Sequence, residues 1–114
     1  MSRNEIMYLM DMTESCEKVL RFTHGLTQAE FTADEKTYDA VVRNLEIVGE
    51  AAKQVSQEVR TKLPQVEWRK IAGLRDMLAH AYFGIDNVIL WDVVQNKVPE
   101  LLTLLNNFLD KERD

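Results

Sequence analysis

Hydrophobic residues recur at steps of three and four along most of the chain, which is the spacing of one face of an α-helix. The first stripe predicts a helix from about residue 4 to residue 24 and consists of Ile6, Leu9, Met10, Cys16, Val19 and Leu20. We expect Ser2 or Asn4 to cap this helix and Gly25 to end it. No segment shows the strict alternation of apolar and polar residues that is typical of a strand.

The second stripe predicts one long helix from about residue 33 to residue 62 and consists of Tyr38, Val41, Leu45, Val48, Ala52, Val55 and Val59. The connector before it, residues 26–32, has room for a turn of helix capped by Thr27 or Thr32. Gly49 lies in the middle of the long helix, where glycine costs about 1 kcal/mol relative to alanine. We therefore expect the third helix to approach the second one closely at Gly49.

The segment around Pro64 ends the second helix. A third helix, opening at Gln65 or Glu67, runs to a turn at residues 84–86 and buries Trp68, Ile71, Leu74 and Leu78. The last stripe consists of Val88, Trp91, Val94, Val98, Leu101, Leu105 and Phe108. Pro99 falls inside this stripe without changing its phase, which predicts a kink in one continuous helix. Together the stripes predict a single all-α domain over residues 1–114, an up-and-down four-helix bundle with a kinked C-terminal helix.

The overall charge limits what this bundle is expected to bind. The net charge is −5 at pH 7, whereas generic nucleic-acid-binding domains are usually basic. Any contact with RNA must then come from a local basic cluster rather than from the field of the whole molecule. The third helix offers such a cluster in Arg69, Lys70 and Arg75.

Other features exclude several kinds of protein. The single cysteine, Cys16, rules out an internal disulfide, fits a reducing compartment and is expected in the core. No apolar run reaches the length of a membrane span, and the N-terminus lacks the pattern of a signal peptide, so we expect a cytoplasmic protein without membrane contact. No Cys/His group has metal-binding spacing and no glycine-rich phosphate loop is present, so we predict neither metal nor cofactor.

The third helix carries the residues with the clearest chemistry, Arg75, His80 and Tyr82, in what we expect to be its last turns. Histidine exchanges protons near neutral pH, and the planar arginine fork matches phosphate oxygens. This pair suits cleavage of RNA without metal, in which the ribose 2′-OH attacks the adjacent phosphorus. Asp76 lies four residues before His80 on the same face and is placed to accept a hydrogen bond from its ring.

Helix geometry sets a limit on a site made from one copy. Arg75 and His80 are five residues apart, roughly 140° around the axis, so they flank one edge without stacking. A tight site therefore needs a second element or a second copy of the chain. The polar band Arg43, Asn44, Glu46, Glu50 and Lys53 on the second helix is either a solvated face or a support for that edge. In the second interpretation Asn44 and Glu50 are the favoured supporting residues.

The run from Trp68 to Asp86 resembles the HepT toxins of the HEPN superfamily, whose signature Rx4HxY is matched by Arg75, His80 and Tyr82. Residues 43–53, and Trp91 followed by residues 98–101, agree with the same family. The resemblance implies an endoribonuclease with Arg75 and His80 as catalytic residues at the cleft of a symmetric homodimer. It also implies a partner, an MntA-like nucleotidyltransferase antitoxin that transfers AMP from ATP to Tyr82.

Two alternatives remain open at the level of the sequence. The first is a non-catalytic HEPN module that binds a nucleotide or RNA. The second is a helical dimerisation subunit in which Arg75 and His80 only complement the dipole at a helix C-terminus.

Overall fold

The computed structural model describes residues 1–82 and 86–113, without the side chains of residues 80–82 and 113. Within these residues every regular element is a helix. The elements are α1 (Arg3–Thr23), α2 (Gln28–Ala33), α3 (Glu35–Gln54), α4 (Gln57–Lys62), α5 (Trp68–Ala72), α6 (Leu74–Tyr82), α7 (Asn87–Asp92), the π-helical turn η1 (Val93–Lys97) and α8 (Val98–Arg113). The predicted all-α class is confirmed.

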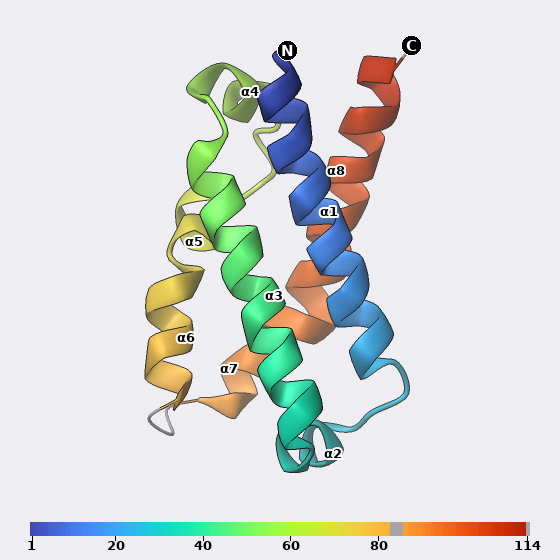
Figure 1. Cartoon of the computed structure of the whole chain (residues 1–114), viewed down its shortest axis with the longest axis vertical. Coiled ribbons are helices and arrows are strands. Elements are labelled where there is room, and N and C mark those ends of the chain that lie inside the picture. Colours follow the sequence, from blue (N-terminus) through green and yellow to red (C-terminus); the bar gives the residue numbers. More distant parts are fainter. Residues whose placement is uncertain (83–85, 114) are drawn as a thin grey trace.

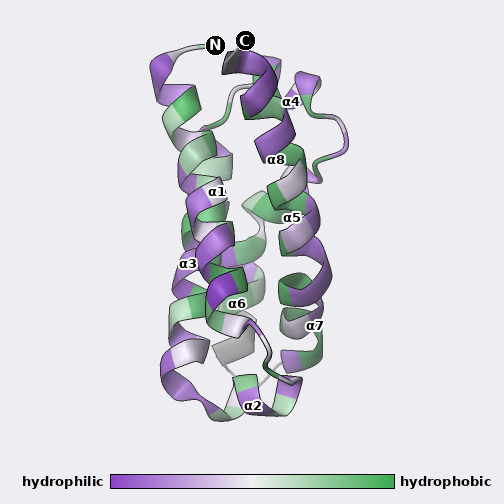
Figure 2. Cartoon of the chain, turned by 90° about the vertical axis from the view of Figure 1, so that its right-hand side faces the viewer, coloured by the Kyte–Doolittle hydropathy of each residue, from purple (hydrophilic) through white to green (hydrophobic). Residues whose placement is uncertain are grey.

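The long helices run up and down along a molecule of 43 × 26 × 21 Å (Figure 1). Helix α1 packs against both α3 and α8, and the α5–α6 segment packs on α3. Successive long segments are antiparallel, so α6 runs in the direction opposite to α3, and both termini lie at the same end (Figure 1). The predicted up-and-down bundle is confirmed, and the helices carry the expected hydrophobic and hydrophilic stripes (Figure 2).

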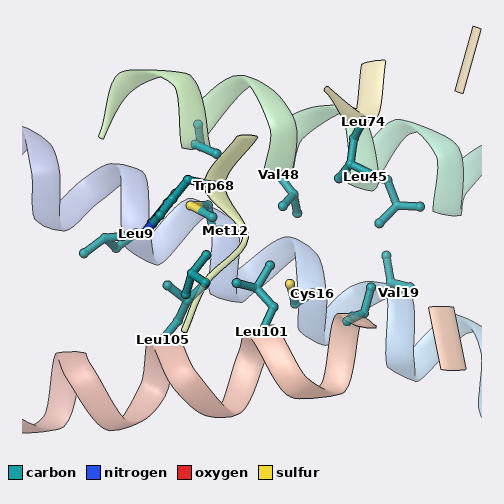
Figure 3. Close-up of a cluster of buried hydrophobic side chains, with 14 of the residues drawn as sticks. Leu9, Met12, Cys16, Val19, Leu45, Val48, Trp68, Leu74, Leu101 and Leu105 are labelled. Atoms are coloured by element: carbon teal, nitrogen blue, oxygen red, sulfur yellow. The ribbon is translucent and has the colours of Figure 1, made fainter. Parts of the chain in front are cut away.

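The core lies between α1, α3, α5–α6 and α8. Its central side chains are Leu9, Met12, Cys16, Val19, Leu45, Val48, Trp68, Leu74, Leu101 and Leu105 (Figure 3). Burying a large apolar side chain is worth about 1.5–3 kcal/mol, so these contacts dominate the stability of the bundle. Cys16 is buried as predicted, and burial raises the pKa of its thiol to about 12. The inclusion of Met10 in the stripe was wrong: Met10 is 47% exposed, because Met12 takes the inward position one turn after Leu9.

The prediction of one helix from residue 33 to residue 62 is wrong at both ends. At the start, Thr27 and Glu30 form a capping box that creates the separate helix α2. Asp34 then caps α3, where its side chain accepts a hydrogen bond from the Thr37 amide. The short helix at the predicted connector is therefore as expected, but the long helix begins two residues later.

At its other end the long helix stops at residue 54, and three side-chain hydrogen bonds stabilise the break. The Ser56 amide donates to Glu5 Oε1 on α1 at 3.1 Å, while the Ser56 hydroxyl accepts from the Val59 amide at 3.2 Å. The Arg60 guanidinium donates to the Ala52 carbonyl at 2.8 Å, where the Val55 amide also donates at 3.2 Å, and so adds a second hydrogen bond at the end of α3. These bonds begin a second helix, α4, in place of a continuation of α3.

The predicted third helix is divided at Gly73 into α5 and α6. The amide of Gly73 donates to the carbonyls of Arg69 and Lys70 at 3.1 and 3.2 Å, which closes α5 before α6 begins. The close approach expected at Gly49 is confirmed at this same junction. A Cβ atom on Gly49 would lie 3.1 Å from the Ile71 carbonyl oxygen and 3.5 Å from Leu74 Cβ. Glycine therefore lets α3 lie directly against the α5–α6 junction.

The C-terminal segment is continuous from α7 through η1 to α8, and its axis changes direction on the way (Figure 1). The amide of Val98 donates to the carbonyl of Val93, five residues earlier, which is the bond of a π turn. Pro99, which has no amide hydrogen, follows at once. The predicted kink is therefore confirmed, and Asp86 caps α7 as predicted. Residues 84 and 85 of the predicted turn lie outside the described residues.

Candidate functional site

Arg75 lies on the first turn of α6 and its side chain is 69% exposed. It reaches across to α3, where Arg75 Nη1 lies 3.4 Å from Glu50 Oε1. Lys53 Nζ lies at the same distance from the same oxygen. The structure thus brings together two residues singled out in the sequence, Arg75 and Glu50, and adds Lys53 to them.

The position of Arg75 corrects the expectation that it occupies the last turns of a helix. Because the chain breaks at Gly73, Arg75 is the second residue of α6. The helix dipole does not favour a cation at this end, since it stabilises anions at the N-terminus and cations at the C-terminus. Asp76, the next residue, is exposed and is the acidic residue of this first turn. The helix dipole therefore explains an acidic residue at position 76, but it does not explain a basic residue at position 75.

The rest of the predicted motif is described only in part. The backbone at residues 80 and 82 is helical and belongs to the last turn of α6. The side chains of His80 and Tyr82 lie outside the described residues. The contact between Asp76 and His80, and the exposure of Tyr82, therefore stay predictions.

Asn44 is buried in α3, and its side-chain amide donates to the Ala40 carbonyl at 2.8 Å. This hydrogen bond stays inside α3 and does not reach Arg75. The register of the two helices nevertheless relates Asn44 to the motif. Gly49 contacts Leu74 and Glu50 contacts Arg75, and the two helices are antiparallel (Figure 1). Both helices rise by the same distance per residue. Asn44 lies five residues before Gly49 on α3, so it lies at the level of the last turns of α6.

The predicted basic cluster of Arg69, Lys70 and Arg75 is partly neutralised. Lys70 Nζ lies 2.7 Å from Glu67 Oε2, and Lys97 Nζ from η1 lies 3.8 Å from the other oxygen of Glu67. The hydrogen bond and charge of Glu67 raise the pKa of Lys70, and Lys70 in turn lowers the pKa of Glu67. Sequence reasoning missed Glu67 and Lys97, although the three-residue spacing of Glu67 and Lys70 was a usable signal for their pair.

An apolar hollow of about 550 Å³ lies between α5–α6 and α7–η1–α8. Its apolar wall includes Ile71, Leu74, Met77, Ile89, Val93 and Leu104. Its charged lining residues are balanced, with Glu67, Asp92 and Glu100 against Arg69, Lys70 and Lys97. Ile89 is 49% exposed, so apolar surface at this hollow faces solvent in a single copy of the chain. The sequence stripes gave no sign of this hollow, because its walls come from segments that are separate in the sequence, residues 65–77 and residues 89–104.

No group of three or more His, Cys, Asp or Glu side chains within residues 1–82 and 86–113 is arranged to hold a metal ion. None of the helices in that part of the chain is both long and apolar enough to cross a membrane.

The helical bundle and the exposed Arg75 on its third long segment agree with the helical domain expected of the HEPN type. The family model for Ribonuclease HepT-like proteins matches residues 12–108, and the chain belongs to this family. As a member of this family, the chain is an enzyme of the endoribonuclease class. The match contains every candidate site residue, namely Asn44, Glu50, Arg75, Asp76, His80 and Tyr82.

Curated relatives agree with the family. The chain is similar to "Putative RNase MJ0127" of Methanocaldococcus jannaschii, with 47% identity over 92 residues that span 81% of this chain and 76% of that protein. It is also similar to "Probable ribonuclease HepT" of Thermococcus cleftensis, with 41% identity over 101 residues that span 89% of this chain and 92% of that protein. No solved structure matches the chain. The resemblance drawn from Arg75, His80 and Tyr82 is thus confirmed for the family and the class of enzyme.

Proposed function

We propose that this chain is a metal-independent ribonuclease toxin that cleaves RNA through Arg75 and His80 of an Rx4HxY motif. The observation that carries the proposal is the family match over residues 12–108, which includes the whole motif. The exposed position of Arg75 supports the catalytic role. A helix dipole stabilises cations at the C-terminus, so it does not explain a cation on the first turn of α6. This argument also weighs against the purely structural interpretation of Arg75.

The proposed reaction needs only the RNA and the side chains of the protein. The 2′-oxygen attacks the adjacent phosphorus, the bond from phosphorus to the 5′-oxygen breaks, and a cyclic phosphate and a 5′-hydroxyl are released. His80 moves the proton between these two oxygens, and general acid–base catalysis of this kind is worth about 10²–10⁴-fold. Arg75 holds the charge that gathers on the other phosphate oxygens, where a well-aimed donor is worth roughly 3–4 kcal/mol. In this proposal Asp76 fixes the orientation of the His80 ring. Asn44 is a second residue that supports the His80 ring, from the neighbouring helix α3.

A homodimer completes this site in the proposal. Arg75 and His80 are five residues apart on one helix, roughly 140° around its axis, so in this proposal a second copy is needed to surround one phosphate. The apolar hollow beside α6 supports such a dimer, because its charged residues are balanced and do not repel a second copy related by a twofold axis. A symmetric interface there would also double the cluster of Arg69, Lys70 and Arg75.

The proposal includes control by an MntA-like nucleotidyltransferase antitoxin. This partner would transfer AMP from ATP to the Tyr82 hydroxyl, releasing pyrophosphate. Each added AMP places a bulky anion next to Arg75 and His80, where it fills the site and repels RNA. Tyr82 is the last residue of α6, and the proposal requires its hydroxyl to be accessible to a second protein.

The experiment that tests the ribonuclease is cleavage of single-stranded RNA by the purified chain in the presence of a chelator. We expect cleavage by the wild type and a loss of at least about 100-fold in His80→Ala, the lower end of the usual contribution of acid–base catalysis. Thermal melting of both proteins is the control for folding, and we expect similar melting temperatures. A well-folded His80→Ala variant with full activity would refute the catalytic role. Binding of RNA without cleavage by the wild type would favour the non-catalytic HEPN module.

A further inference from the structure

One oxygen of Glu50 lies between two cations that come from different helices. Lys53 Nζ, from the last turn of α3, and Arg75 Nη1, from the first turn of α6, each lie 3.4 Å from Glu50 Oε1. A carboxylate oxygen held by a lysine and an arginine occupies the same kind of position as a phosphate oxygen. The free protein thus holds an anion of its own at the point where the proposed substrate brings one.

We propose that Lys53 and Arg75 together bind a phosphate of the RNA, and that this phosphate displaces the carboxylate of Glu50. The inference rests on the proposed ribonuclease function and adds two assignments to it. Lys53 becomes a second phosphate-binding residue beside Arg75. Glu50 becomes an internal anion that keeps the two cations together until RNA arrives.

The packing below these side chains fixes the distance between the two helices that carry the cations. Gly49, next to Glu50, lies directly against Ile71 and Leu74, so the backbones of α3 and the α5–α6 junction cannot separate without losing this contact. Lys53 and Arg75 therefore start from positions set by the core. Only the outer parts of their side chains need to move when a phosphate replaces the carboxylate.

The pair is placed to exchange with a ligand because it is open to solvent. The side chains of Lys53, Glu50 and Arg75 are 42%, 50% and 69% exposed. Exposed ion pairs at this distance contribute little to stability, so displacing Glu50 costs little. Lys53, Glu50 and Arg75 together carry one net positive charge, on a chain whose net charge is −5. This local positive charge attracts a polyanion such as RNA.

The neighbouring residues indicate on which side the RNA lies. A hollow of about 370 Å³ between α1 and α3 is lined by Glu50, by the carboxylates Asp11 and Glu46, and by Arg43. These carboxylates make the α1 side of Glu50 unfavourable for phosphate. The RNA is therefore expected along the α6 side, where Arg75 and the rest of the motif lie.

The test is the binding of a single-stranded RNA whose riboses are all 2′-O-methylated, so that no 2′-hydroxyl is available for cleavage. Fluorescence anisotropy over a range of salt concentrations gives the affinity and its salt dependence. For single strands each phosphate contact contributes about 0.7 to the slope of log K against log salt. Lys53→Gln should lower the slope by at least about 0.7 and the affinity at 0.1 M salt by about fivefold. Glu50→Gln should bind RNA about two- to fivefold more tightly than the wild type.

The chain supplies a matched control in Glu14 and Lys18 of α1. They form an ion pair of the same length, 3.4 Å, with similar exposure. We expect Lys18→Gln and Glu14→Gln to leave the affinity and the salt slope unchanged. Thermal melting of all four variants checks that each one is folded.

The outcomes separate this inference from the ribonuclease proposal. If the wild type binds and cleaves RNA but Lys53→Gln has the slope of Lys18→Gln, Lys53 does not bind phosphate and only the further inference is overturned. If Glu50→Gln binds RNA more weakly than the wild type, Glu50 is not a competitor of the phosphate and the exchange is overturned. If the wild type neither binds nor cleaves RNA, both the inference and the proposed function are overturned.

Discussion

At the scale of single residues, the guanidinium of Arg75 is held by charge rather than by burial. Its side chain is largely exposed and forms an ion pair with Glu50 of α3. Its carbon chain therefore contributes little to the core, and its substitution should change activity without unfolding the protein. This makes Arg75 a suitable position for a precise substitution.

Arg75→Lys should not behave as a conservative change. Lysine keeps the charge but loses the planar fork that binds two phosphate oxygens at once. We expect kcat/KM for RNA cleavage to fall by at least about tenfold, which corresponds to roughly 1.4 kcal/mol. Arg21→Lys on α1, at an exposed arginine beside Phe22, is the matched control and should keep full activity. Wild-type rates in Arg75→Lys would mean that Arg75 acts only as a point charge.

Tyr82→Phe should separate cleavage from regulation. Cleavage should fall only moderately, because the ring is kept and the hydroxyl is at most an auxiliary donor to phosphate. Modification by the nucleotidyltransferase antitoxin should be lost, because the acceptor oxygen is missing. Intact-mass analysis after co-expression with the antitoxin checks this: the wild type should gain mass in steps of AMP and Tyr82→Phe should not.

The matched control for this experiment is Tyr8→Phe, at a partly buried tyrosine of α1. It should be modified to the same extent as the wild type. If Tyr82→Phe still gains AMP, the acceptor lies elsewhere and the regulatory part of the proposal fails, while the ribonuclease part stands.

At the scale of helices, the contact of α3 with the α5–α6 junction decides where Arg75 lies. This contact exists because Gly49 has no side chain, and the nearest atom to a Cβ there is the backbone oxygen of Ile71. A backbone atom moves only together with its helix. Any atom added at Gly49 therefore shifts the α5–α6 segment, and Arg75 with it, away from Glu50.

Gly49→Ala should destabilise the protein and reduce cleavage. Alanine gains about 1 kcal/mol in helix propensity, but overpacking typically costs about 1–3 kcal/mol, so we expect a net loss of about 1 kcal/mol. Urea denaturation measures the free energy of unfolding, and RNA cleavage measures the displacement of Arg75. Gly73→Ala is the control, since its Cβ would lie at 3.4 Å or more from its neighbours and its φ is −85°. Equal stability of the two variants would contradict the role of Gly49.

At the scale of the whole molecule, the acidic net charge and the apolar hollow point to the same arrangement. A chain with a net charge of −5 does not attract RNA by its overall field. Two copies joined at the hollow would cover its exposed apolar wall and bring two local basic clusters together. Solubility and RNA binding would then both depend on the same interface.

The protein should therefore be a dimer at micromolar concentration, and its activity should depend on dimerisation. Ile89→Glu places a charge on the exposed wall of the hollow and should give an inactive monomer that is still folded. Met7→Glu, at a methionine of α1 that is 53% exposed, is the matched control and should remain an active dimer. Sedimentation gives the oligomeric state of each variant. An active monomer would refute the composite site, and a monomer from Met7→Glu alone would move the interface to α1.

Comparison of the expected and observed helices shows where local information was sufficient. The stripe of the third helix identified Trp68, Leu74 and Leu78 as buried, because burial on one helix face repeats every 3.6 residues. Gly49 was recognisable as a contact point, because glycine inside a helix is unfavourable unless something requires it. The inclusion of Met10 failed because a spacing of three or four residues alone does not choose between neighbouring positions.

The sequence by itself determined the helical class, most of the core, the kink at Pro99 and the family motif at Arg75, His80 and Tyr82. These features depend on residue type and on spacing within one segment, which the sequence displays directly. The end of α3 at Gln54 was decided by the tertiary structure, because Glu5, from a distant part of the sequence, accepts the hydrogen bond of the Ser56 amide that follows it. The contact of Arg75 with Glu50 was decided in the same way, since it joins helices 25 residues apart. The apolar hollow likewise exists only after α6 and α8 have packed around the core, because no local pattern specifies the space between two segments.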